Sequence, residues 1–319
     1  MNQKTAHITE FEHGISAIDT DYVRPLFDAS HVIVQDGHAA FVDTGTNHSV
    51  PLLLDALERQ GADNAAVDYV FLTHVHLDHA GGAGALMQHL PNAKAVIHPR
   101  GARHMIDPTQ LVKGAEAVYG KERCQEMYGN PLPIDESRVL IVDDEQTIDF
   151  RGRPLQCIFT EGHARHHYCL SDPTSRGVFT GDSFGVSYRE LDTANGEFIF
   201  PTTTPIHFDP PEAHKAIDRI MSLESEALYL THYSRVRNPT RLADDMHQRI
   251  DDLVAIARKH ANDNNRTEAM HKSMFSYFAE ALDAHGFPAD EDRLHAILDM
   301  DVVLNTMGIE YWLDHCADA

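Results

Sequence analysis

The chain has 319 residues, enough for one large domain or for one domain with an appendage. It carries 26 Lys and Arg residues against 49 Asp and Glu residues, and a net charge of −23 argues against nucleic acid as a partner. No apolar run reaches 18 residues and the first residues lack an apolar core, so we expect no membrane span, no secretory signal and a cytoplasmic location. The scattered cysteines form no CxxC pair, so we expect free, buried thiols at Cys124, Cys157, Cys169 and Cys316.

Short apolar runs alternate with amphipathic segments over the first two thirds of the chain, which indicates an α/β layered domain. Length and β-branched or aromatic content predict strands at His31–Val34, Ala39–Val42, Tyr69–Leu72, Ala95–Ile97, Val139–Val142, Leu155–Phe159, Tyr168–Leu170, Gly177–Phe179 and Ala227–Leu230. Helices are predicted at Val50–Gln60, His79–Leu90, Thr109–Tyr128 and Pro211–Leu223. Asp36 and Gly37, between two of these strands, predict a tight hairpin turn.

After about Asn238 the pattern is helical throughout. Apolar residues at helical spacing predict helices at Thr240–Asn262, Ala269–His285 and Asp292–His315, and place Trp312 in the core. We therefore predict a catalytic domain over residues 1–237 and a helical extension over residues 238–319. Its apolar faces must be buried, so we expect the extension to pack on the first domain or to form a homodimer interface.

The segment between Val70 and Gly82 carries the clearest chemical signal. An apolar run ends before His74 and His76, which are two residues apart and point the same way on an extended backbone. Asp78 and His79 follow where the chain turns into the next predicted helix. Imidazole and carboxylate ligands together suit zinc, and also iron or manganese. A His-rich loop without a metal is the alternative, but the order of the ligand types and the glycines that follow favour a metal site.

Three more ligand-type side chains lie where an apolar run meets a loop: His163, Asp182 and His232. Loops held by a rigid sheet are where functional residues are usually placed. Taken singly, each could equally be a capping residue. Together with the first four, they complete the ligand set of a two-metal site.

The order H-x-H-x-D-H, G-H, G-D and T-H resembles the metallo-β-lactamase superfamily over roughly residues 15–233. The resemblance implies an αβ/βα four-layer sandwich with the metals at one edge and, here, a C-terminal helical extension. It implies that one metal is held by His74, His76 and His163, and a second by Asp78, His79 and His232. Asp182 would bridge the two metals, and Asp78 and Asp182 are the carboxylates that we assign to catalysis.

Residues around these ligands are given two interpretations each. Asp43 resembles the D-T-G turn of the superfamily, where it would orient a ligand imidazole, and a plain turn is the alternative. Arg165, His166 and His167 would orient ligands or contact substrate, or form a solvated turn. A third set would wall an apolar substrate pocket or simply pack within a loop: Phe184, Tyr188, Phe200, His207 and Phe208.

The implied cofactors are two divalent ions, zinc with iron or manganese as alternatives. A water between them would lose a proton near neutral pH, and the bridging hydroxide would attack a small ester, thioester, lactone or related substrate. Asp182 argues against β-lactamases, which use Cys or Ser near this position. The seven ligands resemble glyoxalase II, whose C-G-R-x-F-x-G signature is missing, and the quorum-quenching lactonases, whose Tyr would precede Tyr188. The chain also resembles a group of metallohydrolases without an assigned substrate, at His79–Gly84, Ile97–His104 and Gly162–His167.

A second function class is a non-haem di-iron redox protein of the same fold, acting on oxygen or nitric oxide. His76, where flavodiiron proteins carry Glu, and the missing flavodoxin module favour a hydrolase. A metal-binding scaffold without turnover is a third interpretation, and the complete ligand set argues against it.

Overall fold

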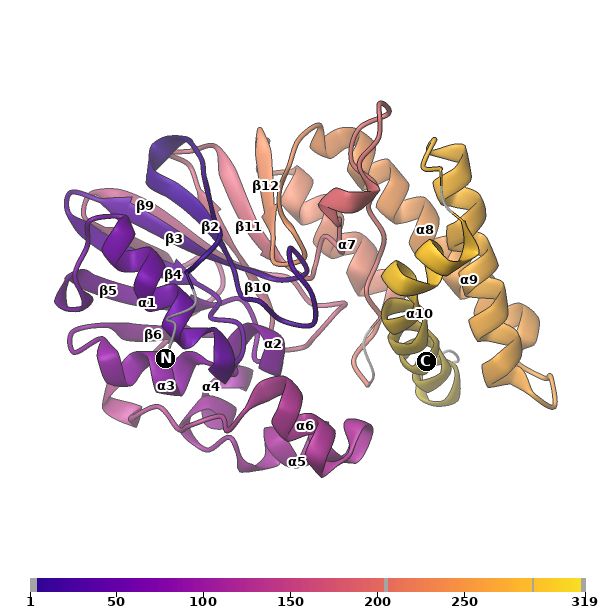
Figure 1. Cartoon of the computed structure of the whole chain (residues 1–319), viewed down its shortest axis with the longest axis horizontal. Coiled ribbons are helices and arrows are strands. Elements are labelled where there is room, and N and C mark those ends of the chain that lie inside the picture. The colour runs from indigo at the N-terminus through magenta and orange to yellow at the C-terminus, as the bar shows by residue number, and fades with distance from the viewer. Residues whose placement is uncertain (1–4, 204–205, 289, 317–319) are drawn as a thin grey trace. The chain divides into compact units, whose positions relative to one another are not determined.

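The computed structural model describes residues 5–203, 206–288 and 290–316, which divide into two compact units (Figure 1). The first unit comprises Met1–Phe159, His166–Gly181 and Ala227–Arg235, and the second comprises Thr160–Arg165, Asp182–Glu226 and Val236–Ala319. Each unit is defined by contacts in space and combines several segments of the chain. The predicted domain boundary between residues 237 and 238 therefore stays a prediction. Ala289 and the last three residues of the predicted extension lie outside the described residues.

The first unit is built on two mixed β-sheets. In the seven-stranded sheet the strands lie in chain order: β1 (Ile8–Glu10), β2 (Ile15–Asp19), β3 (Ala29–Gln35), β4 (His38–Val42), β5 (Val67–Leu72), β6 (Lys94–Ile97) and β7 (Val139–Ile141). The six-stranded sheet also follows chain order: β8 (Thr147–Phe150), β9 (Arg153–Phe159), β10 (Tyr168–Asp172), β11 (Gly177–Gly181), β12 (Ala227–Leu230) and β13 (Ser234–Val236). Pairing is parallel from β4 to β7 and between β11 and β12.

Side chains along the central strands alternate between two apolar cores, as the two-residue period of a strand requires. Phe71 of β5 lies between the sheets, in a core that also holds Phe179 and Tyr229 of the second sheet. Its neighbours Val70 and Leu72 lie in the core that joins the first sheet to helices α1 (Val50–Arg59), α3 (Ala83–His89) and α4 (Pro99–Ile106). The central strands are thus apolar on both faces, which explains their continuous apolar runs.

The predicted strands are confirmed to within two residues at each end, and the predicted hairpin turn joins β3 to β4. Asp36 and Gly37 have φ angles of 50° and 76°, the positive values that a two-residue turn of this kind needs. The sequence does not predict β1, β2, β8 or β13, which are short or interrupted by polar residues.

Two predicted helices are each divided in the structure. The prediction of a single helix over residues 79–90 is wrong. Helix α2 (Leu77–Ala80) ends before Gly81, and α3 begins after Gly82. The helix predicted over residues 109–128 divides at Gly120, whose φ of 80° separates α5 (Thr109–Tyr119) from α6 (Lys121–Tyr128). Helix α4 is missed, although His98 as its N-cap and Pro99 at its first turn are helix-start signals.

The second unit contains four α-helices among its described residues: α7 (Pro210–Met221), α8 (Pro239–His260), α9 (Arg266–Ala284) and α10 (Glu291–His315). Helix α8 contacts the other three (Figure 1, orange to yellow). The three helices predicted for the extension are therefore confirmed, and Trp312 of α10 is buried as expected. That the extension packs on the first domain or forms a homodimer interface stays a prediction.

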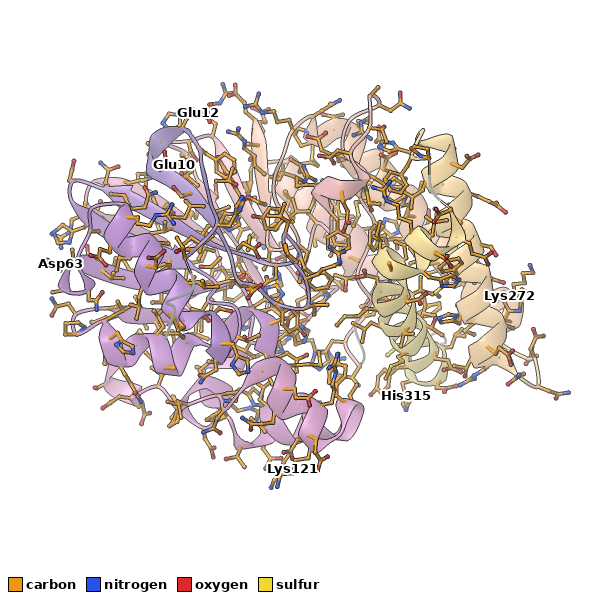
Figure 2. All side chains as sticks on the ribbon, viewed as in Figure 1. Glu10, Glu12, Asp63, Lys121, Lys272 and His315 are labelled. Atoms are coloured by element: carbon orange, nitrogen blue, oxygen red, sulfur yellow. The ribbon has the colours of Figure 1, made fainter. Side chains whose placement is uncertain are left out.

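Acidic side chains lie on the surface, as the net charge of the sequence suggests. Exposed carboxylates include Glu10, Glu12 and Asp63, which are labelled in Figure 2. All four cysteines are free; three are buried, and Cys316 is partly exposed. Among the described residues, no helix combines the length and apolar character needed to cross a bilayer.

One ion pair is completely buried in the first unit. Arg153 of β9 donates from Nε to Asp172 Oδ1 at 3.0 Å and from Nη2 to Oδ2 at 2.5 Å. Its Nη1 donates to the His13 carbonyl at 2.7 Å, and Ser175 also donates to the carboxylate. The side chains are 1% and 0% exposed, so each charge depends on the other for compensation.

We expect Asp172→Asn to lower the free energy of unfolding by about 3–5 kcal/mol, because the variant leaves the Arg153 guanidinium buried without a counter-charge. Urea unfolding followed by circular dichroism measures this loss. The control is Asp68→Asn, which removes the partner of the exposed Arg151 guanidinium at 2.7 Å and should cost at most about 1 kcal/mol. Equal losses in the two variants would contradict the prediction.

Candidate metal centre

Five of the seven predicted ligands belong to the first unit, at the ends of two strands that belong to different sheets. His74 and His76 follow β5, Asp78 and His79 lie in α2, and His232 follows β12. Parallel strands present their carboxyl ends at one edge, so ligands that follow them are brought to that edge.

Asp78, His79 and His232 form a group whose ligand atoms all lie within 4.8 Å of one another. His79 Nε2 is 3.9 Å and His232 Nε2 is 3.6 Å from Asp78 Oδ2. The other ring nitrogen of each His is engaged: His79 Nδ1 lies 3.0 Å from Asp43 Oδ2, and His232 Nδ1 lies 2.9 Å from the Phe27 carbonyl. A carboxylate or a carbonyl can only accept, so both Nδ1 atoms carry the proton and both Nε2 atoms present lone pairs. The donor set fits a divalent metal ion.

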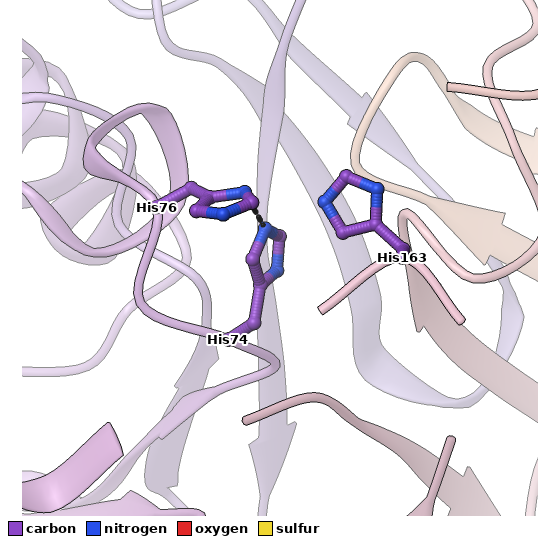
Figure 3. A group of neighbouring side chains, drawn as sticks. All are labelled: His74, His76 and His163. Carbon is purple, nitrogen blue, oxygen red and sulfur yellow. Dashed lines mark hydrogen bonds between the residues drawn. The ribbon is translucent and has the colours of Figure 1, made fainter. Parts of the chain in front are cut away.

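His74 and His76 form the neighbouring pair (Figure 3). His74 Nε2 lies 2.8 Å from His76 Nδ1, and His74 Nδ1 lies 3.2 Å from the Thr73 hydroxyl. His74 is fully buried, whereas His76 is partly exposed. The extended spacing thus brings two ring nitrogens together, as the sequence predicts. His163, the third side chain drawn, belongs to the second unit.

Asp43 connects three of the segments that carry these ligands. Its Oδ1 accepts from the Thr73 amide at 2.8 Å, and its Oδ2 accepts from the Thr231 hydroxyl at 2.9 Å as well as from His79. The Thr73 hydroxyl donates to the same carboxylate. Asp43 is 1% exposed and has a φ of 58°, a left-handed conformation that Asp tolerates better than most residues. The interpretation in which Asp43 orients an imidazole therefore accounts for the contacts, and the plain-turn interpretation does not.

Close backbone packing explains the glycines around this carboxylate. Gly45 has a φ of 62°, and a Cβ there would lie 2.7 Å from Thr20 Cγ2. A Cβ on Gly82 would lie 2.6 Å from the Thr46 carbonyl, whereas the real Gly82 amide donates to the Gly45 carbonyl at 2.9 Å. The turn after Asp43 and the end of α2 can meet only because both positions lack side chains.

His163 and Asp182, the remaining predicted ligands, lie together in the second unit. His163 Nε2 is 3.4 Å from Asp182 Oδ2, and His163 Nδ1 is 3.3 Å from the Thr202 carbonyl. Both side chains are buried, with 4% and 6% exposed. A Cβ on Gly162, whose φ is 115°, would lie 2.5 Å from Ala213 Cα, so this glycine lets the His163 loop pack on α7.

A small pocket lies beside this pair, within the second unit. Its apolar wall consists of Pro201, Phe208, Ala213, Met246 and Ile250. Its polar side consists of Glu161, Gly162, His163, Asp182, Ser183 and Thr202.

Of the five residues predicted to wall an apolar pocket, Phe208 does so. Phe200 packs instead against Tyr188 and Phe278, with ring centroids 5.9 Å and 5.1 Å away. Phe184 is fully buried and is not among the lining residues. Pocket walls from α8 were missed, because Met246 and Ile250 read in sequence as ordinary positions of an amphipathic helix.

Arg165, His166 and His167 are predicted either to support the ligands or to form a solvated turn, and the structure shows both behaviours. Arg165 is exposed, as a solvated turn predicts. His166 and His167 are buried, and the ring of His167 stacks on that of His74 at 4.9 Å. His167 therefore supports the position of a predicted ligand.

Three supporting residues escaped the sequence analysis: Thr73, Thr231 and Asp28. The two threonines bind Asp43, and the repeated Thr-His pair at residues 73–74 and 231–232 was the available signal. Asp28 has no comparable signal. Burial raises the pKa of its carboxyl to about 7, and the neighbouring His232 and His79 act in the opposite direction.

Comparison with known proteins identifies relatives of this chain. The chain is 27% identical over 226 residues to the metallo-β-lactamase fold-containing protein ST1585 of Sulfurisphaera tokodaii, covering 69% of this chain and 77% of that one. It is 25% identical over 217 residues to a hydroxyacylglutathione hydrolase of Aeromonas hydrophila, covering 67% of this chain and 65% of the hydrolase.

Solved structures show the same fold. The crystal structure of ST1585 matches with a TM-score of 0.64 at 21% identity, covering 93% of this chain and 98% of that one. The metallo-β-lactamase family protein TTHA1429 of Thermus thermophilus matches with a TM-score of 0.66 at 17% identity, covering 95% and 94%. Two mixed sheets flanked by helices are thus the predicted sandwich, and the model of the metallo-beta-lactamase superfamily matches residues 23–232. The chain therefore belongs to the metallo-β-lactamase superfamily.

Proposed function

We propose that this protein is a hydrolase that uses two divalent metal ions, zinc in the first place, on a small ester, thioester or lactone. The observation that carries the proposal is the convergence of His79 Nε2 and His232 Nε2 on Asp78 Oδ2, at 3.9 Å and 3.6 Å, with both Nδ1 atoms already engaged. The hydroxyacylglutathione hydrolase of Aeromonas hydrophila among the relatives supports a hydrolytic activity.

His74, His76 and His163 would hold one ion, Asp78, His79 and His232 the other, and Asp182 both. Chain connectivity supports the contribution of the second unit: Asp182 directly follows Gly181 at the end of β11, and the His163 loop is flanked by residues of the first unit on both sides. When bound, the ions would supply an activated water and stabilise developing negative charge. Asp182 would offset the repulsion between two divalent cations.

The pocket beside His163 and Asp182 suits a substrate whose acyl group is small and apolar. The pocket is small, with room for about one water molecule, so it suits at most a short substituent of a substrate. The walls formed by Phe208, Met246 and Ile250 favour a hydrocarbon chain. We therefore propose that the acyl side of the substrate occupies this pocket.

A metal-loaded screen of p-nitrophenyl esters, thioesters, lactones and phosphodiesters tests the function. Turnover of an acyl substrate that requires the metal would support the proposal. Turnover of phosphodiesters alone, or none of any substrate by protein that holds both metals, would overturn it. Native iron together with oxygen or nitric oxide consumption would favour the di-iron redox alternative.

We expect two tightly held metal ions per chain after dialysis, measured by elemental analysis. Asp182→Ala should lower this count to one or fewer and abolish hydrolysis, because two cations would lose their shared carboxylate. Asp192→Ala, which removes an unrelated carboxylate of the second unit, serves as the control and should keep both ions. A dinuclear, fully active Asp182→Ala protein would contradict the bridging role.

Asp43→Ala should be milder and lower metal affinity or turnover by about 10–100-fold, as expected when a partner that orients a ligand imidazole is lost. Competition with a chromophoric chelator measures the affinity. The exposed Asp63, which caps a short turn in the same unit, provides the matched control Asp63→Ala. Unchanged affinity in Asp43→Ala would show that the Asp43–His79 contact does not orient a ligand.

Met246→Ala and Ile250→Ala should each shift acyl preference toward longer chains. We expect the ratio of kcat/KM for octanoyl over acetyl p-nitrophenyl esters to rise about 10-fold or more, because discrimination by an apolar pocket amounts to about 1–3 kcal/mol per methylene. The ratio is independent of the fraction of active protein. Leu253→Ala, a buried α8 residue that does not line the pocket, should leave the ratio unchanged.

A further inference from the structure

A symmetric group of four side chains joins α7 to α8, apart from all predicted ligands. Each helix carries a His followed four residues later by an Asp: His214 and Asp218 on α7, and His247 and Asp251 on α8. The pairs cross between the helices, since His214 Nε2 lies 3.1 Å from Asp251 Oδ1 and His247 Nε2 lies 3.3 Å from Asp218 Oδ1. The imidazole rings are parallel within 8°, and each His side chain is 29% exposed.

The carboxylates decide which ring nitrogens carry protons. An ionised carboxylate only accepts hydrogen bonds, so each Nε2 donates a proton to it. A neutral imidazole protonated at Nε2 has its lone pair on Nδ1. The two Nδ1 atoms lie 2.6 Å apart, so two lone pairs face one another. Such an arrangement is stable only when a cation, either a shared proton or a metal ion, lies between the two nitrogens.

We propose that His214 and His247 form a second, exposed metal site that takes a divalent transition metal ion through their Nδ1 atoms. Imidazole suits Zn²⁺, Cu²⁺ and Ni²⁺, whereas Mg²⁺ and Ca²⁺ prefer oxygen ligands. Carboxylates that hold the distal nitrogen of a ligand His fix its tautomer, and both rings have such a partner. Water would complete the coordination.

The geometry requires only a small adjustment. Zn–N bonds of about 2.0–2.1 Å at a tetrahedral angle place two ligand nitrogens roughly 3.3 Å apart. The present separation of 2.6 Å therefore has to widen by about 0.7 Å, and both rings have to turn so that their lone pairs point at one ion instead of at one another. Partly exposed side chains on two helices can accommodate this change. The two flanking carboxylates and the net charge of −23 favour a cation at this position.

An ion here would also fix the helices that wall the acyl pocket. His214 directly follows the pocket residue Ala213, and His247 directly follows Met246. Bound metal would hold these two positions at a set spacing. This site is independent of the proposed hydrolase centre, because it shares no residue with it.

The test titrates untagged protein, already holding its tightly bound ions, with Zn²⁺ by calorimetry. We expect one additional equivalent for the wild type, and its loss or an affinity at least about 10-fold lower in His214→Ala and in His247→Ala. Both variants should retain the tightly held ions and the wild-type circular dichroism spectrum. Sub-stoichiometric Cu²⁺ should give an electron paramagnetic resonance spectrum with two nitrogen ligands in the wild type and in neither of these two variants.

His295→Ala is the matched control, because His295 also contacts an Asp four residues on, at 2.6 Å, but its ring stacks on Phe275 instead of an imidazole. It should keep the additional equivalent. Wild-type protein that binds no further ion, or single variants that bind it unchanged, would overturn the proposal and leave a shared proton as the cation. The comparison counts the difference between wild type and variant, so it holds whatever number of ions the hydrolase centre contains.

Discussion

The buried carboxylate of Asp43 is the interaction on which the site depends. It accepts hydrogen bonds from Thr73 after β5, from Thr231 after β12 and from His79 in α2. Strands β5 and β12 belong to different sheets, so one side chain sets the spacing of the strand ends that carry the predicted ligands. A carboxylate that is 1% exposed is stable only with such a full set of donors, and the donors are held in place in return.

Bringing the ligand side chains together crowds their atoms and holds polar groups close to one another, and the surrounding fold must offset both costs. Imidazole nitrogens and a carboxylate within 4.8 Å of each other leave little room for adjustment, and each ring is fixed through its distal nitrogen. The glycines at positions 45 and 82 allow the backbone to come close enough for these contacts. Preorganisation of this kind lets a metal bind without ordering its ligands first.

In the second unit, residues of the helical extension lie beside two of the predicted ligands. Met246 and Ile250 of α8 lie in the same pocket as His163 and Asp182, so the extension contributes to the surroundings of two predicted ligands. The crossed His–Asp pairs lie on the same two helices, one residue beyond the pocket wall. Helices α7 and α8 thereby carry both an apolar pocket wall and a polar group of crossed His–Asp pairs.

Local sequence determined most of the strands, the tail helices and the candidate ligands of this protein. The two-residue period of β5 and the spacing of His74 and His76 act over a few residues, where backbone geometry alone decides direction. The same holds for the Asp36–Gly37 turn, whose positive φ angles suit those residue types. Contacts across long stretches of chain were decided only by the tertiary structure. Asp43 meets Thr231 188 residues away and His214 meets Asp251 37 residues away, and no local pattern encodes such pairs. The burial of Asp28, the division of the helix at Gly81 and Gly82, and the pocket walls from α8 belong to the same class, because each arises where separate segments pack together.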